Sequence, residues 1–441
     1  MGAEDSPRGS VGLCTLGCKV SQYETEAIGE EFIRRGFAVR PFDGVCDIYV
    51  INTCTVTAES DRKSRQMIRR AVKRNPGAVI CVTGCYSQMS PEDIKSIGGV
   101  SVITGSRDKL RTVDLAVRAF SERDEDGIYV SCRPVDNREF ENMSITTAPR
   151  TRVYVKIEDG CESKCTYCRI SGARGHVCSK PPEDVIREVE TLHKQGTREI
   201  VLTGIEVAAY GADFDTRYGL SDLICELAAR GSCERIRLGS LAPELCGERF
   251  AAGISGCRIL APHFHISMQS GSDSVLRAMK RRYTRETALR NIEGLRRAVP
   301  GAQFTSDLMV GFPGESEEDF LATLSFVQEA GLLDAHVFAY SRRPGTPAAE
   351  YPDQIPEPVK RERSARLIAG KNRMRDEVLA GLVAAGEPLS AIFETRDGDF
   401  FTAHAANYAE IRVRCSRDLH GEMLPVRPLY AEDGIIYGEL L

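Results

Sequence analysis

The chain has 441 residues, of which 42% are hydrophobic, and its formal net charge is −5. This length predicts about two or three domains with cores of their own, and the slightly acidic balance excludes nucleic-acid binding through overall charge alone. No apolar stretch is long enough to cross a bilayer and residues 1–10 lack the apolar centre of a signal peptide, so we expect a cytoplasmic protein with a disordered tail at 1–10.

Residues 11–122 alternate short apolar runs with amphipathic stretches, which is typical of a parallel sheet covered by helices. We predict strands at 11–16, 47–51 and 78–82, and helices at 22–35 and 61–75. A cysteine follows each of these strands: Cys18, Cys54 and Cys85. Because the carboxyl ends of parallel strands meet at one edge of a sheet, the sequence predicts that the three thiols form one site.

Basic residues cluster in three places despite the negative net charge. They line one side of the predicted helix at 61–75, recur at 280–282, and recur again between 360 and 375. A solvated helix face explains any one of these clusters. Three together favour a polyanionic partner.

The next segment carries Cys161, Cys165 and Cys168, with Tyr167 directly before the last cysteine. Thiolates spaced in this way can hold a cubane iron–sulfur cluster and leave one iron without a protein ligand. Zinc is the competing interpretation, with His176 or Cys178 as a fourth ligand, but structural zinc usually takes two close pairs of ligands. With 16 cysteines and no export signal, disulfides are not expected.

From about residue 150 the predicted strands alternate with helices, at 153–157, 199–202, 235–238, 263–268, 303–309 and 335–338. This succession predicts a partial (β/α) TIM-like barrel, whose working face lies at the carboxyl ends of its strands. His263 and His265 share one strand face, and we expect them to line the barrel as hydrogen-bonding residues rather than to bind a metal.

The segment 383–441 contains five short alternating stretches separated by turn signals such as Asp397-Gly398. This pattern predicts a small β-barrel. The segment holds more acidic than basic residues, so we expect shape and a few arginines, such as Arg412 and Arg414, to matter for any RNA contact.

Several of these motifs together resemble the radical S-adenosylmethionine (SAM) methylthiotransferases, over nearly the whole chain. They are residues 15–26, 161–168, 202–206, 263–271, 307–315 and 340–348. Lys19-Val20 resembles the branch that acts on threonylcarbamoyladenosine in tRNA, whereas other branches act on isopentenyladenosine in tRNA or on a ribosomal protein aspartate. Ser171-Gly172 departs from the usual Pro-Tyr, which concerns the fit of the substrate more than the radical chemistry.

The resemblance implies three domains: an N-terminal methylthiotransferase domain at 11–122, a radical SAM core at 147–378 and a TRAM RNA-binding domain at 383–441. It implies two 4Fe-4S clusters, an auxiliary one on Cys18, Cys54 and Cys85 and a SAM-cleaving one on Cys161, Cys165 and Cys168. SAM-binding residues are then expected at Tyr167, Gly204, Ile205, Glu206, Gln269, Ser270 and Gly311. Arg174 or Arg343 is expected to bind the substrate carboxylate.

The function implied by the resemblance is methylthiolation at C2 of threonylcarbamoyladenosine, next to the anticodon of a lysine tRNA, by methyl transfer and radical C–H activation. The expected partners are the anticodon loop and an electron donor such as flavodoxin or ferredoxin, with no membrane and a monomeric enzyme. Two alternatives stay open: another methylthiotransferase specificity, for isopentenyladenosine or the ribosomal aspartate, and a non-catalytic iron–sulfur protein that binds RNA or senses redox state.

Overall fold

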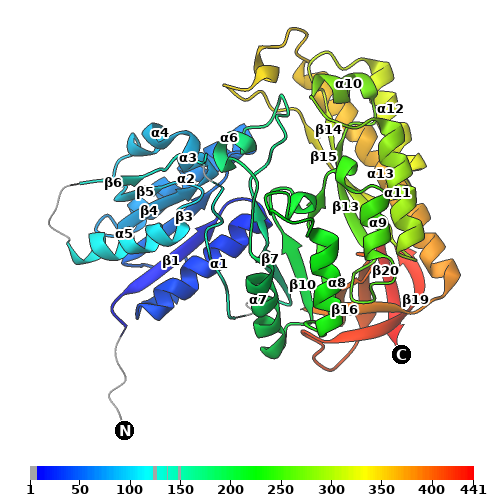
Figure 1. The fold of residues 1–441 in the computed structure, drawn as a ribbon, viewed down its shortest axis with the longest axis horizontal. Coiled ribbons are helices and arrows are strands. Elements are labelled where there is room, and N and C mark those ends of the chain that lie inside the picture. The colour runs from blue at the N-terminus through cyan, green and yellow to red at the C-terminus, as the bar shows by residue number, and fades with distance from the viewer. Residues whose placement is uncertain (1–6, 123–126, 137, 148–149) are drawn as a thin grey trace. The chain divides into compact units, whose positions relative to one another are not determined.

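The computed structural model describes residues 7–122, 127–136, 138–147 and 150–441 (Figure 1). The chain packs into two units. Unit 1 consists of Met1–Thr146, Glu158–Lys164 and Cys168–Lys180, and unit 2 of Thr147–Ile157, Cys165–Tyr167 and Pro181–Leu441. Two segments expected within the radical SAM core, 158–164 and 168–180, therefore pack with the N-terminal sheet.

Unit 1 is built on a six-stranded parallel sheet with the strand order β2-β1-β3-β4-β5-β6. The strands are β1 (Ser10–Thr15), β2 (Ala38–Arg40), β3 (Ile48–Thr53), β4 (Val79–Gly84), β5 (Val102–Thr104) and β6 (Tyr129–Ser131). Every residue of β3 and β4 is buried. Continuous burial explains their uninterrupted apolar sequences, because helices cover both faces of a parallel sheet.

The helices of unit 1 begin and end at recognisable signals. They are α1 (Lys19–Arg34), α2 (Ala58–Arg74), α3 (Cys85–Met89), α4 (Pro91–Lys95), α5 (Lys109–Ser121) and α6 (Ile170–Arg174). At the start of α2, the Thr57 side chain accepts a hydrogen bond from the Ser60 N–H, and two acidic residues lie in the first turn. Order begins before residue 11, since the Arg8 N–H donates to the Gly36 carbonyl and Ser10 starts β1.

The first part of unit 2 contains two parallel sheets. One has the order β11-β10-β7 and the other β12-β13-β14-β15. Their strands are β7 (Arg152–Lys156), β10 (Glu199–Thr203), β11 (Arg235–Leu238), β12 (Ser240–Leu241), β13 (His263–Gln269), β14 (Gln303–Val310) and β15 (Leu332–Ala339). An isolated parallel bridge between Ile236 and Leu260 continues the strand succession from β11 toward β13, as expected for a partial barrel.

Helices follow the strands of unit 2 in the βα pattern. They are α7 (Pro182–Lys194), α8 (Leu220–Arg230), α9 (Glu248–Ile254), α10 (Asp273–Ala278), α11 (Arg285–Ala298), α12 (Glu317–Glu329) and α13 (Glu357–Ala385). Helix α13 extends beyond residue 378, the expected end of the core, because Leu379 packs into the hydrophobic core of the C-terminal barrel.

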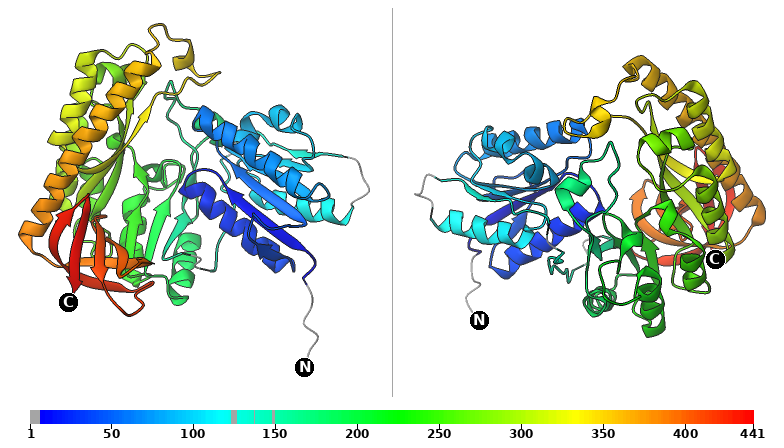
Figure 2. Two further views of the ribbon diagram at one scale, coloured as in Figure 1. Left: turned by 180° about the vertical axis from the view of Figure 1, so that it is seen from behind. Right: turned by 45° about the horizontal axis from the view of Figure 1, so that its top comes forward.

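The C-terminal segment forms a closed barrel with the order β16-β17-β18-β20-β19 (Figure 2). Its strands are β16 (Leu389–Asp397), β17 (Phe400–Ala405), β18 (Glu410–Arg414), β19 (Met423–Glu432) and β20 (Ile435–Leu440). All five coincide with the predicted stretches within a few residues. Alternating buried positions of β17 and β18, such as Phe401 and Ile411, fill its interior.

Buried ions join this small barrel to the amino ends of the parallel strands. Glu199, the first residue of β10, accepts hydrogen bonds from Arg235 and Arg237, and Arg237 also donates to the carbonyls of Ala405 and Ala406. Burial alone would raise the pKa of Glu199, but the arginines outweigh this effect and lower it to about 2. The C-terminal barrel thus covers the amino ends of these strands and not their carboxyl ends.

None of the helices in the described part of the chain combines the length and the apolar composition that crossing a bilayer requires.

Candidate active site

The three cysteines of unit 1 lie where the sequence predicts them, at the carboxyl ends of the adjacent strands β1, β3 and β4. Cys18 precedes α1, Cys54 follows β3, and Cys85 begins α3. Cys54 and Cys85 are buried and Cys18 is exposed. Because β1, β3 and β4 are neighbours in the parallel sheet, the three cysteines lie at one edge of it. This donor set fits the soft ligands that an iron–sulfur cluster takes.

Two glycines allow the chain to bring these thiols together. Gly17 has a φ of +148°, and a Cβ atom there would lie 3.3 Å from Cys54 Cβ. Gly84 has a φ of +107°, and a Cβ atom there would overlap the carbonyl oxygen of Thr53. Each glycine directly precedes a cysteine of the site, so close backbone approach at this edge depends on the missing side chains.

The environment of the thiols is apolar but contains a strong cation. The pKa of Cys54 is raised to about 11, mainly by burial and in part by the neighbouring Cys85 and Cys18, while hydrogen bonds act in the opposite direction. Burial also raises the pKa of Cys85, whereas the charges of Arg174 and Lys109 lower it. Thiols of this kind lose their protons when a metal binds, because the thiolate is the ligand.

Arg174 lies directly against Cys85 and is fully buried. Its Nε donates to Cys85 Sγ at 3.1 Å, while Nη1 donates to Glu24 Oε1 and, at 3.1 Å, to Asp159 Oδ2. The side chains of Arg174 and Glu24 have no exposed surface. A buried charge requires such partners, and here the two carboxylates hold the guanidinium in a fixed orientation toward the sulfur.

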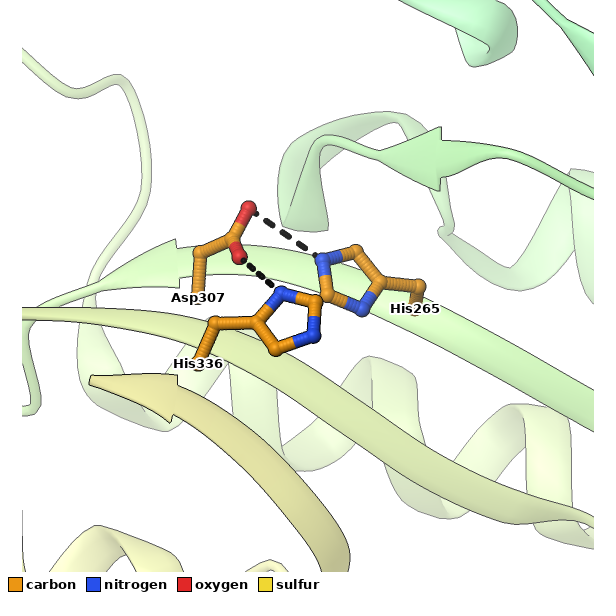
Figure 3. Close-up of side chains that lie close together, drawn as sticks. All are labelled: His265, Asp307 and His336. Atoms are coloured by element: carbon orange, nitrogen blue, oxygen red, sulfur yellow. Dashed lines mark hydrogen bonds and ion pairs between the residues drawn. The ribbon is translucent and has the colours of Figure 1, made fainter. Parts of the chain in front are cut away.

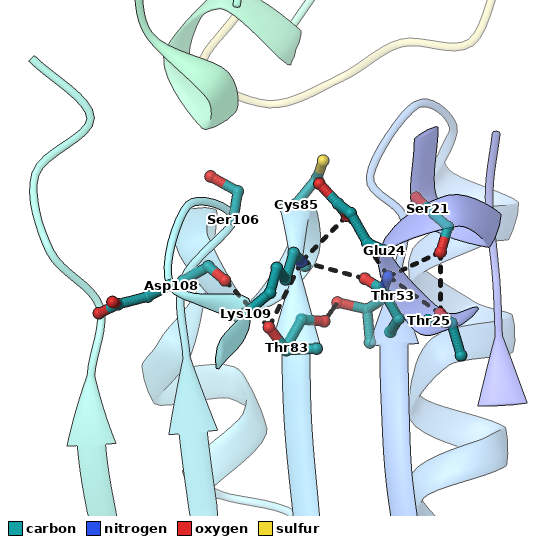
Figure 4. A network of polar contacts seen from close by, with 12 residues as sticks. Ser21, Glu24, Thr25, Thr53, Thr83, Cys85, Ser106, Asp108 and Lys109 are labelled. Atoms are coloured by element: carbon teal, nitrogen blue, oxygen red, sulfur yellow. Dashed lines mark hydrogen bonds and ion pairs between the residues drawn. The ribbon is translucent and has the colours of Figure 1, made fainter. Parts of the chain in front are cut away.

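The Glu24 carboxylate also contacts a second buried cation, Lys109, and Figure 4 shows the network around this pair. Lys109 Nζ lies 3.3 Å from Glu24 Oε2 and donates to Asn52 Oδ1 and Thr83 Oγ1 at 3.2 and 3.4 Å. Burial lowers the pKa of Lys109, and Glu24 opposes that effect. Lys109, Arg174, Glu24 and Asp159 thus form a buried network of ion pairs beside Cys85.

The contacts of Arg174 do not favour the role in substrate binding that the sequence predicts for it. To bind a substrate carboxylate, the guanidinium would have to leave Glu24 and Asp159. Arg343, the other expected residue, is 3% exposed, and its carbonyl accepts from the Thr346 backbone and hydroxyl groups. The contacts of Arg174 favour a role beside Cys85, and the assignment of Arg343 stays a prediction.

The cysteines of the second motif lie on the loop that follows β8 (Glu158–Asp159) and leads to α6. In unit 1, the Cys161 N–H donates to the Gly175 carbonyl, and Cys168 Sγ accepts from the Ile170 N–H at 3.3 Å. In unit 2, Cys165 Sγ accepts from Arg281 Nη1 at 3.2 Å. Hydrogen bonds from N–H groups to ligand sulfurs tune the properties of iron–sulfur clusters, so the contacts of Cys165 and Cys168 fit such a site.

Arg281 is a site residue that sequence reasoning missed, because it lies in a basic run that favoured phosphate binding. Its Nη2 donates to the Ser267 carbonyl, and Nε donates to the Tyr283 hydroxyl. Despite burial, its neighbours Tyr283, Tyr167 and Cys165 raise its pKa. Arg281 and Arg174 thus make the same contact in different units: each donates to one cysteine sulfur.

The third basic cluster is also partly structural, which corrects its interpretation as an exposed patch. Lys360 and Arg363 of α13 are buried. Lys360 Nζ donates to the Tyr340 carbonyl at 3.0 Å, and Arg363 Nη1 donates to Glu315 Oε1 at 2.6 Å. A residue needs tertiary partners to bury a charge, so spacing in the sequence alone could not reveal this role.

Gly204, Ile205 and Glu206 follow β10 directly, at the carboxyl end of a barrel strand as predicted. Glu206 Oε1 accepts from the Ala242 N–H at 3.0 Å. Burial raises the pKa of Glu206 to about 7, although the Ala242 N–H and the charge of Arg281 lower it. The proximity of Arg281 connects this turn to Cys165. The assignment of the three residues to SAM stays a prediction.

The other expected SAM residues also follow strands. Gln269 ends β13 with a φ of +69°, and the Ser270 hydroxyl lies 3.2 Å from Thr323 Oγ1. Gly311 follows β14, and a Cβ atom there would overlap the Lys360 side chain. Protein packing, rather than only the adenosyl group, therefore requires glycine at this position.

Tyr167 belongs to an apolar cluster at the same ends of the strands. Its ring meets Phe312 edge to face at 6.4 Å, and Met309, Met279 and Tyr340 are members of the cluster. Sequence reasoning placed Tyr167 next to the cysteines without identifying these partners. His176 and Cys178, considered as zinc ligands, have other contacts: His176 Nδ1 with Glu162 Oε1, and Cys178 Sγ with the Asp159 carbonyl.

A third group with metal-ligand atoms lies on β13, β14 and β15. His265, Asp307 and His336 offer one donor atom each, all within 4.8 Å of one another (Figure 3). His265 Nε2 lies 3.2 Å from Asp307 Oδ2, and His336 Nδ1 lies 3.1 Å from Asp307 Oδ1. The sequence indicated that His265 lines the barrel, but it gave no sign that Asp307 and His336 join it.

Two family models match the chain. Residues 10–105 match the Uncharacterized protein family UPF0004, and residues 155–327 match the Radical SAM superfamily. The first range contains Cys18, Cys54 and Cys85, and the second contains Cys161, Cys165 and Cys168.

Several proteins of known activity are similar to this chain over most of its length. The threonylcarbamoyladenosine tRNA methylthiotransferase MtaB of Bacillus subtilis is 40% identical over 98% of this chain and 95% of its own. MtaB of Aquifex aeolicus is 36% identical over 82% of this chain and 88% of its own. A tRNA-2-methylthio-N(6)-dimethylallyladenosine synthase of Acetivibrio thermocellus is 31% identical over 94% of this chain and 87% of its own.

Among solved structures, the radical S-adenosylmethionine methyltransferase TsrM of Kitasatospora setae has a similar fold. Its TM-score is 0.57 at 16% sequence identity, over 88% of this chain and 81% of that one. At this identity the likeness concerns the fold alone.

Our first prediction concerns metal content. If both three-cysteine sets hold a cubane cluster, the anaerobically reconstituted protein binds about eight irons, and replacing Cys161, Cys165 and Cys168 together removes about half of them. Iron and zinc analysis of the two purified proteins measures this. Zinc without iron in the parent protein would refute the cluster interpretation.

A second prediction concerns the Arg174 contact, studied in the variant without Cys161, Cys165 and Cys168, so that the remaining iron reports on the N-terminal site alone. Arg174→Lys keeps the positive charge but removes the guanidinium group, which donates to the Cys85 sulfur and to the carboxylates of Glu24 and Asp159. We expect iron loss to a chelator to become about tenfold faster, since partners of metal ligands typically contribute this much to affinity. Arg62→Lys, on the exposed side of α2, is the control, and equal rates in both variants would contradict the prediction.

Proposed function

Because the chain belongs to the MtaB family of threonylcarbamoyladenosine tRNA methylthiotransferases, we propose that it methylthiolates C2 of threonylcarbamoyladenosine in tRNA. The observation that carries this proposal is the 40% identity to MtaB of Bacillus subtilis over 98% of the chain, with both three-cysteine sets present. The family also makes the chain a radical SAM enzyme, which uses a 4Fe-4S cluster and SAM.

We assign the SAM-cleaving cluster to Cys161, Cys165 and Cys168 and a second, auxiliary cluster to Cys18, Cys54 and Cys85. When bound, the first cluster and SAM supply a radical able to activate a ring C–H bond, and the second supplies the site of sulfur transfer. General base catalysis would be insufficient for an unactivated ring carbon, so no side chain is assigned as acid or base.

The residues of the chain orient the two sites in the same manner. Arg174 fixes the Cys85 sulfur in unit 1, and Arg281 fixes Cys165 in unit 2. The buried Glu24 and Asp159 carboxylates hold Arg174, and the Ser267 carbonyl and Tyr283 hydroxyl hold Arg281. Both guanidinia place positive charge beside thiolate ligands, which stabilises their ionised form.

The carboxyl ends of the unit 2 strands provide the proposed SAM site. Tyr167 supplies an apolar ring, and the turns after β10, β13 and β14 supply backbone groups: Gly204 to Glu206, Gln269 with Ser270, and Gly311. The apolar packing of Tyr167 against Phe312 and Met309 excludes water from one side of this site. Arg343, which follows β15 in the chain, stays our proposal for the substrate carboxylate.

The C-terminal barrel offers a surface suited to tRNA. The rings of Tyr430 and Tyr437 stack at 4.8 Å, Phe400 meets Tyr437 edge to face, and the Arg414 guanidinium lies 5.9 Å from the centre of Phe400. Half of Tyr430 is exposed. Exposed aromatic rings with nearby arginines are typical of RNA-binding surfaces, where bases stack on the rings. This supports the assignment of residues 383–441 as a TRAM domain.

Further partners follow from the reaction. We propose a lysine tRNA as the substrate, with its anticodon loop presenting the modified base, and an electron donor such as flavodoxin or ferredoxin. The exposed cations of α2, among them Arg69 and Lys73, provide a second basic surface for phosphates. We propose that the enzyme acts as a monomer in the cytoplasm.

Our third prediction tests the division of labour between the two cysteine sets. Replacing Cys18, Cys54 and Cys85 by alanine removes the proposed sulfur site, so methylthiolation is lost while reductive cleavage of SAM continues at a measurable rate. Product analysis of 5′-deoxyadenosine and of modified nucleosides measures both activities. Methylthiolation at the parental rate in this variant would show that the N-terminal cysteines are not the sulfur site.

The fourth prediction identifies the substrate. A strain that lacks the gene loses 2-methylthio-threonylcarbamoyladenosine from its tRNA, and a plasmid copy restores it, as measured by mass spectrometry of nucleosides. A copy with Cys161→Ala is the matched control and does not restore it. If 2-methylthio-isopentenyladenosine or the modified ribosomal aspartate disappears instead, the specificity is wrong while the radical mechanism stands. Loss of none of these modifications would favour a non-catalytic iron–sulfur protein.

A further inference from the structure

The side chain of Lys109 is fully buried among the residues that lead into the N-terminal cysteines. Its Nζ donates to Asn52 Oδ1 at 3.2 Å and to Thr83 Oγ1 at 3.4 Å. Asn52 comes two residues before Cys54 on β3, and Thr83 comes two residues before Cys85 on β4. The lysine therefore contacts both of the adjacent strands that lead into these two cysteines.

The surroundings of Lys109 Nζ require the ammonium form of the amine. Its third partner is the Glu24 carboxylate, whose Oε2 lies 3.3 Å away and only accepts. The Asn52 amide nitrogen donates to the Ser21 carbonyl, so Oδ1 faces the lysine, and the Thr83 hydroxyl donates to a backbone carbonyl. All three partners therefore accept, and only an ammonium group donates three hydrogen bonds. Burial lowers the pKa of Lys109, and the Glu24 charge opposes this effect.

The Glu24 carboxylate has enough other donors to stay ionised without Lys109. Arg174 Nη1 donates to its Oε1, and Arg174 Nη2 donates to its Oε2 at 3.2 Å. The Asn52 amide nitrogen lies 3.4 Å from the same Oε2. Because this bidentate pair persists, replacing Lys109 by a neutral residue removes one positive charge from the buried network.

The ammonium group lies close to the backbone that leads into Cys85. A Cβ atom at Gly84 would lie 2.6 Å from Asn52 Oδ1, which is the oxygen that accepts from Lys109. One amide oxygen therefore separates the charge from the residue before Cys85, and Figure 4 shows both side chains in this network. Since the lysine has no exposed surface, its charge acts through a medium of low dielectric constant.

We propose that the Lys109 ammonium group raises the reduction potential of the auxiliary cluster held by Cys18, Cys54 and Cys85. This inference rests on the proposed function, which assigns the cluster to these cysteines. Reduction adds one electron from the donor to the cluster and makes it more negative, and a buried cation nearby stabilises the more negative form. Lys109 thus keeps the auxiliary cluster within reach of a low-potential electron donor.

The test uses the full chain without Cys161, Cys165 and Cys168, reconstituted anaerobically, so that only the N-terminal cluster is reduced. The midpoint potential is measured by titration with dithionite and redox dyes, followed by electron paramagnetic resonance. Lys109→Met removes the charge and keeps an unbranched side chain. We expect the equilibrium constant for reduction to fall about tenfold, which lowers the midpoint of the one-electron couple by about 59 mV.

Two further variants separate the charge from hydrogen bonding and packing. Lys109→Gln also lacks the charge but keeps an amide donor, so it is expected to lower the midpoint as much as Lys109→Met does. Lys194→Met, at an exposed position of α7, removes the same charge where water and salt screen it. It is the matched control, and its midpoint is expected to equal that of the parent.

The outcomes distinguish this inference from the function on which it rests. An unchanged midpoint in both Lys109 variants, or a parental midpoint in Lys109→Gln alone, would overturn the inference and leave the proposed function intact. Loss of the cluster from both variants would show a purely structural role for Lys109 and would also overturn it. A parent protein without iron at Cys18, Cys54 and Cys85 would instead contradict the auxiliary cluster and the proposed function itself.

Discussion

Two guanidinium groups, one fully buried and one half-buried, each donate a hydrogen bond to a cysteine sulfur, and much of the candidate site is arranged around them. Arg174 donates to Cys85 and Arg281 to Cys165, so each three-cysteine set has one sulfur fixed by a charged hydrogen bond. A buried arginine is stable only with partners for its charge. The carboxylates of Glu24 and Asp159 are accordingly buried together with Arg174 and form ion pairs with it.

In unit 2 the C-terminal barrel covers the amino ends of the parallel strands, so the carboxyl ends are the ones available for a catalytic site. Buried ions of Glu199, Arg235 and Arg237 join the amino ends of the strands to the C-terminal barrel, and Tyr408 of that barrel stacks on His263. A barrel with packed layers supports loops at its other end, where catalytic groups of such folds lie. The proposed SAM turns lie at that carboxyl end.

The basic residues of this chain have two different roles, which their residue types do not reveal: some contact protein partners in the interior, and others lie on the surface. Arg281, Lys360 and Arg363 lie in basic stretches that favoured contacts with phosphate, yet Lys360 and Arg363 are buried, Arg281 is half-buried, and each contacts protein partners. In contrast, Arg69 and Lys73 of α2 and Arg414 of the C-terminal barrel are exposed, and they remain suited to RNA. Burial decides between these purposes, because desolvation of a charge must be offset by ion pairs or hydrogen bonds.

The sequence by itself was sufficient to predict the fold class and to identify the two sets of three cysteines. Both predictions rest on local properties of the sequence, namely strand periodicity and the spacing of thiols. The motifs around Cys18 and Cys161 were also sufficient to identify the family, and the similarity to MtaB of Bacillus subtilis confirmed it. Only the tertiary structure decided which cations touch sulfur and that Asp307 joins His265 and His336. These contacts link residues far apart in the chain, as Arg174 and Glu24 are, and no local pattern encodes which distant partner a buried charge will meet.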